Sequence, residues 1–122
     1  MNNVICLPYQ PLKELAGSLS AADLQVVVMG EKFVGLVHPC KIYNVLSVGV
    51  PVLYIGPPAS HVSEILDATV SEQLRHGDVD GVVNAIKRIK NSAAKRPVAL
   101  GPESPFAQKT LLPKLVAAMK AN

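Results

Sequence analysis

The sequence predicts an α/β protein built on a doubly wound parallel sheet, and three observations lead to this prediction. Apolar runs rich in valine, leucine and isoleucine alternate along the chain with segments of helical periodicity, an order that produces parallel strands joined by crossover helices. Aromatic residues make up 4% of a chain that is 49% hydrophobic, and this aliphatic bias suits strands covered on both faces. A length of 122 residues predicts one domain, residues 1–122, with a sizeable core.

The first two strands and the helix between them are predicted from apolar runs and prolines. The run Asn3–Leu7 predicts a buried strand that ends at Pro8. Pro11 suits the first turn of a helix that extends to Leu19, because leucines repeat at helical spacing there. The β-branched run Leu24–Met29 predicts the second strand.

Glycine and serine define the next elements. A helix over Cys40–Val48 ends at Gly49, which suits a C-cap. The run Pro51–Ile55 predicts a third strand, and Ser60 is a candidate N-cap for a helix over His61–Ala68.

The last part of the chain predicts a short fourth strand over Val70–Leu74 and two more helices. The prolines between these helices, at positions 97, 102 and 105, predict a loop or an extended crossing segment. The final helix covers Phe106–Lys120, with a kink or a restart at Pro113. The helix before it runs from Asp78 or Asp80 to Asn91. Its apolar face is predicted to point into the core, and this face comprises Val79, Val82, Val83, Ile86 and Ile89.

Composition and charge argue against nucleic acid as a partner and against a membrane-spanning segment. A net charge of +3 is too small to indicate nucleic acid, and no apolar run approaches the roughly 20 residues that span a bilayer. Cys6 and Cys40 lie far apart without metal-ligand spacing, which favours reduced thiols in the cytosol. A basic run predicts a solvated helix face or a weak contact with anionic lipid, and it comprises Lys87, Arg88, Lys90, Lys95 and Arg96.

The carboxyl ends of the strands are the predicted place for a ligand. The most informative loop there starts at Gly35 and runs directly into the helix at Cys40. Backbone N–H groups and the helix dipole favour an anion at such a junction. Lys41 is unfavourable in a first turn unless an anion lies nearby. Two interpretations of this loop therefore remain. Either it binds a phosphate group, or Lys41 is only solvated and Gly35 only turns the chain.

Other polar residues near this edge have two interpretations each. His38 and His61 are candidates to touch a ligand, but a lone histidine without a paired carboxylate is more often incidental. Cys40 is a small packing residue or a thiol activated by its helix start.

At this point the sequence resembles a known family. The segment 39–52, PCKIYNVLSVGVPV, is similar to the P-S-K-x-x-E-x-M-A-x-G-x-P-V signature of retaining family 4 glycosyltransferases. Its G-L-V-x-P-x-K-I-Y form is similar to a bacterial branch that makes capsule, exopolysaccharide or colanic-acid-type polymers. The resemblance continues at Leu7–Pro11, Ala21–Asp23, Gly77–Asp80 and Phe106–Leu112, so it covers nearly the whole chain.

The resemblance implies the GT-B fold, in which two Rossmann-like domains enclose a cleft. This chain matches the second half of the C-terminal, donor-binding domain, with 106–122 as its closing helix. The partner it implies is a missing N-terminal acceptor domain, without which the fragment is expected to be inactive.

The resemblance also implies site residues. Backbone N–H groups of Gly35, Leu36 and Val37 would hold the donor diphosphate, and Lys41 would add its charge. Asn44 stands where the second glutamate of the family's E-x₇-E motif binds the ribose.

Two further parts of the site follow from the same resemblance. The first glutamate of that motif would fall near Leu36 and is absent in strict register, so Glu31 is the catalytic candidate only if the loop is rearranged. Base contacts would come from Pro8, Tyr9 and Gln10, for which a simple strand-end turn is the alternative.

The function implied is transfer of a sugar, with retention, from a nucleoside diphosphate sugar to a glycan or lipid-linked acceptor in cell-surface polysaccharide synthesis. No cofactor and no metal are expected besides this donor substrate. The alternatives are a stand-alone flavodoxin-like nucleotide-binding or regulatory domain, and an interaction module without a small ligand. A cytoplasmic location, peripheral to the inner membrane, and self-association through an exposed sheet edge are further expectations.

Overall fold

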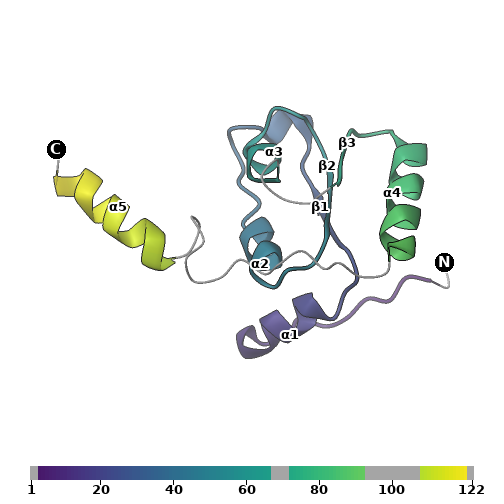
Figure 1. Cartoon of the computed structure of the whole chain (residues 1–122), viewed down its shortest axis with the longest axis horizontal. Helices are drawn as coiled ribbons and strands as arrows, with labels where there is room; N and C mark the ends of the chain where they lie inside the picture. Colours follow the sequence, from purple (N-terminus) through teal and green to yellow (C-terminus); the bar gives the residue numbers. More distant parts are fainter. Residues whose placement is uncertain (1–2, 67–71, 93–107, 121–122) are drawn as a thin grey trace.

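Three short parallel strands form the sheet of this protein, and helices flank it (Figure 1). The structure is a computed structural model that describes residues 3–66, 72–92 and 108–120. The protein is therefore an α/β protein, as the sequence predicts. In chain order the elements are η1 (Leu12–Glu14), α1 (Leu15–Ser20), β1 (Gln25–Val28), η2 (Glu31–Phe33), α2 (Lys41–Ser47), β2 (Val52–Ile55), α3 (His61–Leu66), β3 (Glu72–Leu74), α4 (Val79–Asn91) and α5 (Gln108–Lys120).

The strands follow one another in the order β1-β2-β3, and both pairs are parallel. In the middle strand, Leu53 is paired with Val26 of β1 and with Glu72 of β3. A doubly wound sheet has a point where the strand order reverses. The order of the three described strands contains no such reversal, so the doubly wound arrangement stays a prediction.

The main hydrophobic core lies between one face of the sheet and helices α2 and α3. Side chains alternate between the two faces of a strand, so residues two apart in β1 and β2 point into the same core. The buried members of this cluster are Val27, Met29, Ile42, Val45, Leu46, Val50, Val52, Tyr54, Val62, Ile65 and Leu66.

The other face of the sheet is covered only in part. Leu53 points to it by the same alternation, and both Leu53 and Ala85 of α4 are fully buried. Helix α4 lies on the side of the sheet away from α2 and α3 (Figure 1), where Arg88 forms two hydrogen bonds of 3.0 Å with the Glu72 carboxylate. Val26 and Val28 on this face of β1 remain 41% and 57% exposed.

Several helix boundaries confirm the sequence-based expectations. Gly49 has a φ of 66° directly after α2, a conformation that glycine adopts without steric cost. Asp78 caps α4, because its Oδ1 accepts a hydrogen bond of 2.9 Å from the backbone N–H of Gly81.

Replacing Asp78 by alanine is expected to lower the free energy of unfolding by about 1 kcal/mol, because the Gly81 N–H loses its partner. Thermal unfolding followed by circular dichroism measures this change. Asp80→Ala is the matched control, since Asp80 lies in the same first turn and only its interaction with the helix dipole is lost. Equal destabilisation by both substitutions would contradict the cap assignment.

The strand predicted over Asn3–Leu7 is wrong. Residues 4–11 have no regular secondary structure, and Ile5 and Leu7 are 84% and 74% exposed. A strand needs a neighbour to satisfy its backbone groups, and in the described part of the chain β1 pairs only with β2. The predicted helix after Pro11 is confirmed, with a 3₁₀ turn, η1, as its beginning.

The inward stripe predicted for the helix after Asp78 is also wrong in part. Val79, Val83 and Ile86 are exposed, while Val82 and Ile89 are half-buried. The described strands have 3 or 4 residues and are about 10–13 Å long, whereas a helix of 13 residues is about 20 Å long, so the sheet covers only part of the helix.

The last helix is continuous through Pro113, so the predicted restart there is wrong. Its large apolar side chains, Leu111, Leu112, Leu115, Val116 and Met119, are all exposed. The predictions for residues 67–71, for 93–105 and for Phe106 fall outside the residues that the structure describes.

Candidate functional site

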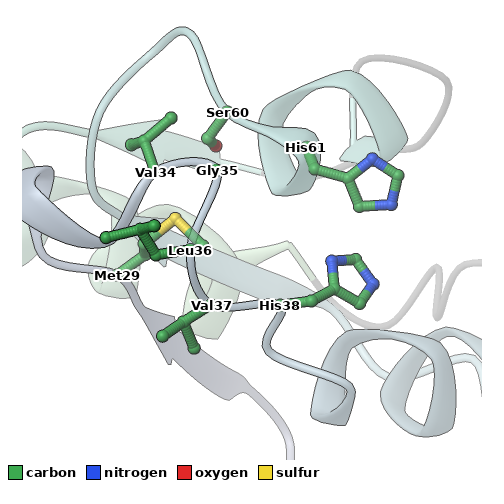
Figure 2. Close-up of a pocket in the computed structure, with 8 residues that line it drawn as sticks. All are labelled: Met29, Val34, Gly35, Leu36, Val37, His38, Ser60 and His61. Carbon is green, nitrogen blue, oxygen red and sulfur yellow. The ribbon is translucent and has the colours of Figure 1, made fainter.

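The loop that follows β1 and the loop that follows β2 meet at the carboxyl edge of the sheet, where the sequence predicts a ligand. They enclose a pocket of about 170 Å³ between the end of β1 and the start of α3 (Figure 2). Figure 2 shows Met29, Leu36 and Val37 at one end of the pocket and two imidazole rings at the other. The lining residues are Met29, Val34, Gly35, Leu36, Val37, His38, Ser60 and His61.

The glycine loop is held in a tight turn. Gly35 has a φ of 78°, a left-handed conformation that favours glycine. The N–H groups of Leu36 and Val37 both donate to the carbonyl oxygen of Phe33, at 3.0 and 2.9 Å. A diphosphate in this pocket would compete with the Phe33 carbonyl for these two donors.

Lys41 does not line the pocket. Its Nζ donates a hydrogen bond of 3.2 Å to the backbone oxygen of Val26. The N–H groups of Gln25 and Met29 bond to the segment of β2, so by alternation the backbone of Val26 points to the other edge of β1. In this structure Lys41 therefore satisfies a carbonyl group on the outer edge of the sheet.

The remaining predicted residues also lie outside the pocket. Tyr9 is 95% exposed, and the side-chain amide of Gln10 donates to the Pro8 oxygen at 2.9 Å. The alternative, a turn at the end of a strand, is wrong as well, because residues 4–11 form neither a strand nor a turn. Glu31 begins η2, and Asn44 is exposed on α2. The structure does not bring Pro8–Gln10, Glu31 and Asn44 together with the glycine loop.

A buried hydroxyl network fixes the floor of the pocket. Ser60 and Ser63 are nearly inaccessible, and the hydroxyl of Tyr54 lies 2.9 Å from Ser60 Oγ. The N–H of Ser63 donates to Ser60 Oγ at 3.2 Å, and the N–H of Ser60 donates to Ser63 Oγ at 2.9 Å. This reciprocal arrangement is a capping box in which serine takes the place of the usual glutamate. Ser60 is thus confirmed as the N-cap of α3.

The feature that sequence analysis undervalued is the meeting of His38 and His61. Their ring centroids are 4.3 Å apart, and both Nε2 atoms lie 2.9 Å from the hydroxyl of Tyr43. On the outer side, a Glu64 oxygen lies 3.8 Å from Nδ1 of His61. Burial raises the pKa of Tyr43, and the neighbouring Cys40 raises it further. The histidines looked solitary in the sequence because the contacts of His61 with His38 and Tyr43 join different elements. Glu64, three residues after His61 on α3, was a signal that the sequence did contain.

Comparison of the chain with protein-family models, with curated proteins and with solved structures finds no match. Over residues 3–66, 72–92 and 108–120, no group of three or more histidine, cysteine or acidic side chains could hold a metal ion. No helix in the same ranges is both long and apolar enough to cross a membrane.

Proposed function

We propose that this chain is the nucleotide-sugar-binding part of a retaining glycosyltransferase of the GT-B type. The observation that supports the proposal is the pocket at the carboxyl edge of the sheet, which is where α/β sheets bind their ligands. The loop that lines it, Gly35–Val37, is also the loop to which the family resemblance assigns the donor diphosphate. In this proposal the described sheet is part of a doubly wound, Rossmann-like domain.

Sugar transfer from such a donor requires stabilisation of the diphosphate as it departs, by fixed dipoles and by cations. The N–H of Gly35 and the positive charge of Lys41 would supply both. Lys41 must leave the Val26 oxygen to reach the pocket, which its exposed and flexible side chain permits. Asn44 would contact the ribose, and Pro8–Gln10 the base.

A second candidate function is a nucleotide-binding or regulatory domain without catalysis. It is favoured by the fact that this chain alone forms the pocket, from the loops before α2 and α3. The glycosyltransferase proposal needs an acceptor-binding domain that acts together with this chain, in the cytoplasm or at its membrane surface. Sugar transfer on addition of such a domain would separate the two candidates.

The charge of Lys41 provides the direct test of the diphosphate site. Lys41→Ala is expected to weaken binding of uridine or adenosine diphosphate by about 10- to 100-fold, which is the range for one charge-assisted contact. Calorimetric titration at constant ionic strength measures this change. Lys90→Ala is the matched control, since Lys90 is an exposed lysine on α4, which lies on the other side of the sheet.

Two outcomes of this titration would contradict the proposal. Binding by neither the wild type nor the control variant would remove the nucleotide function. Equal binding by the wild type and Lys41→Ala would leave nucleotide binding in place and would assign Lys41 only to the sheet edge.

A further inference from the structure

Three side-chain rings meet at the rim of the pocket. The Nε2 atom of His38, in the loop before α2, lies 2.9 Å from the hydroxyl oxygen of Tyr43 on α2. The Nε2 atom of His61, the first residue of α3, lies 2.9 Å from the same oxygen. Both imidazole rings line the pocket (Figure 2). The fold thus brings together two ionisable rings, at one end of a candidate phosphate site, around a shared hydroxyl group.

The Tyr43 hydroxyl has one proton, so it can donate a hydrogen bond to only one of the two imidazole rings and must accept one from the other. A phenol hydroxyl donates one hydrogen bond and accepts others. The Glu64 carboxylate near Nδ1 of His61 favours a proton on that nitrogen, so Nε2 of His61 accepts from Tyr43. The oxygen of Tyr43 then accepts the Nε2–H of His38. Nδ1 is left as the nitrogen of His38 that gains a proton when this ring becomes charged.

A phosphate group in the pocket would need a hydrogen-bond donor besides the N–H groups of the glycine loop, Gly35–Val37. Two of the loop's three N–H groups, those of Leu36 and Val37, already bond to the Phe33 oxygen. Lys41 is engaged at the Val26 oxygen. His38 directly follows the loop and is exposed at the pocket rim. Its charged ring can therefore meet a phosphate group whether or not Lys41 leaves the Val26 oxygen.

We propose that His38 is a proton-dependent contact for the diphosphate of a nucleotide ligand, and that Tyr43 and His61 are the positioning residues that hold its ring. In the charged ring, the Nε2–H stays on Tyr43 and the Nδ1–H donates to a phosphate oxygen. The inference rests on the proposed nucleotide function and adds a residue to that site.

The sign of the pH dependence follows from the surrounding groups. The titratable groups nearest to the two rings are the Tyr43 hydroxyl on α2, the Glu64 carboxylate on α3 and, for each ring, the other imidazole, with 4.3 Å between the ring centroids. The raised pKa of Tyr43 keeps its hydroxyl protonated between pH 5 and 8, where histidine changes its charge. A bound phosphate attracts the positive charge of a protonated His38 ring, and this attraction is lost when the ring is neutral. Binding therefore tightens as the pH falls.

The test is a titration of the whole chain with uridine diphosphate, adenosine diphosphate and inorganic diphosphate at pH 5.5 and pH 8.0. The His38→Gln variant reports the pH dependence that comes from ionisation of the ligand and of the other groups of the chain, His61 included. Between pH 8.0 and pH 5.5, the affinity of the wild type is expected to increase about tenfold more than that of His38→Gln, which is the effect of one charge-assisted contact. Tyr43→Phe keeps the aromatic ring and removes the hydroxyl, and it is expected to reduce this gain severalfold. His76→Gln is the matched control, because His76 bonds to the Met29 oxygen and does not line the pocket.

Proton NMR of the histidine rings separates a positioning role from a structural one. The chain has 3 histidines, and bound diphosphate is expected to change the ring signals of His38 and to leave those of His76 unchanged. Equal pH dependence in the wild type and His38→Gln would overturn the inference and leave nucleotide binding intact. Binding of inorganic diphosphate but of neither nucleotide, with a pH dependence that His38→Gln removes, would keep the His38 contact and reject the nucleotide function. No binding of any of the three probes would overturn both.

Discussion

Replacing Leu53 by alanine is expected to lower the free energy of unfolding by about 2–5 kcal/mol, the range for a leucine truncated in a packed core. Leu53 is fully buried and lies in β2, between the two other strands. It points away from α2 and α3, on the face where α4 buries Ala85. The truncation would leave a cavity that neighbouring strands and α4 cannot fill without breaking their own contacts. Urea unfolding followed by circular dichroism measures the change.

Val26→Ala is the control for this substitution. Val26 is the partner of Leu53 in the register of β1 and β2 and points to the same face, but it is 41% exposed. Its truncation is expected to cost less than about 1 kcal/mol. Similar losses from the two variants would mean that α4 does not close this face of the sheet.

A methyl group at Gly56 is expected to destabilise the protein by at least about 1–3 kcal/mol, the cost of forcing atoms into a packed site. An alanine Cβ at this position would lie 2.6 Å from Cζ of Tyr54 and 2.8 Å from the backbone oxygen of Met29. The Tyr54 ring cannot move aside easily, because it is buried and its hydroxyl belongs to the serine network under the pocket. Gly56→Ala is also expected to distort that pocket.

Gly17→Ala separates this collision from the general effect of adding a methyl group. Gly17 lies in α1, and an added Cβ there has no neighbour within 4 Å. Because alanine is the better helix former, this variant is expected to gain up to about 1 kcal/mol. Parallel urea titrations compare the two. A stable Gly56→Ala variant would contradict the close packing at the carboxyl end of β2.

The described elements show which features of the fold are encoded locally. The segments of β1, α2, β2 and α3 were predicted because each combines an apolar pattern with a nearby glycine, proline or cap. The segment Asn3–Leu7 has the same apolar character but no strand beside it in the described structure, and pairing is not visible in a local pattern. Likewise, the periodicity of α4 predicted an apolar face without indicating how much sheet lies opposite it.

The candidate site divides in the same way. The glycine loop could be placed at the pocket because strand ends and glycines are both visible in the sequence. The bonds from Leu36 and Val37 to Phe33 depend on how the loop closes, and the contact of Lys41 with Val26 depends on strand pairing. Neither could be anticipated from spacing. The meeting of His38 with His61 requires the start of α3 to lie close to the start of α2, so two residues that looked incidental became the centre of the site.

The sequential order of the strands has a consequence for how the chain folds. Each strand lies beside the strand that precedes or follows it in the sequence, so each crossover closes the shortest loop available. Because the entropy lost on closing a loop grows with its length, and because folding rates fall as contacts become more distant in sequence, this order favours rapid folding. The first closure joins β1 to β2 through α2, and the second joins β2 to β3 through α3. Both closures share β2, so we expect the folding nucleus to be centred on this strand, whichever closure forms first.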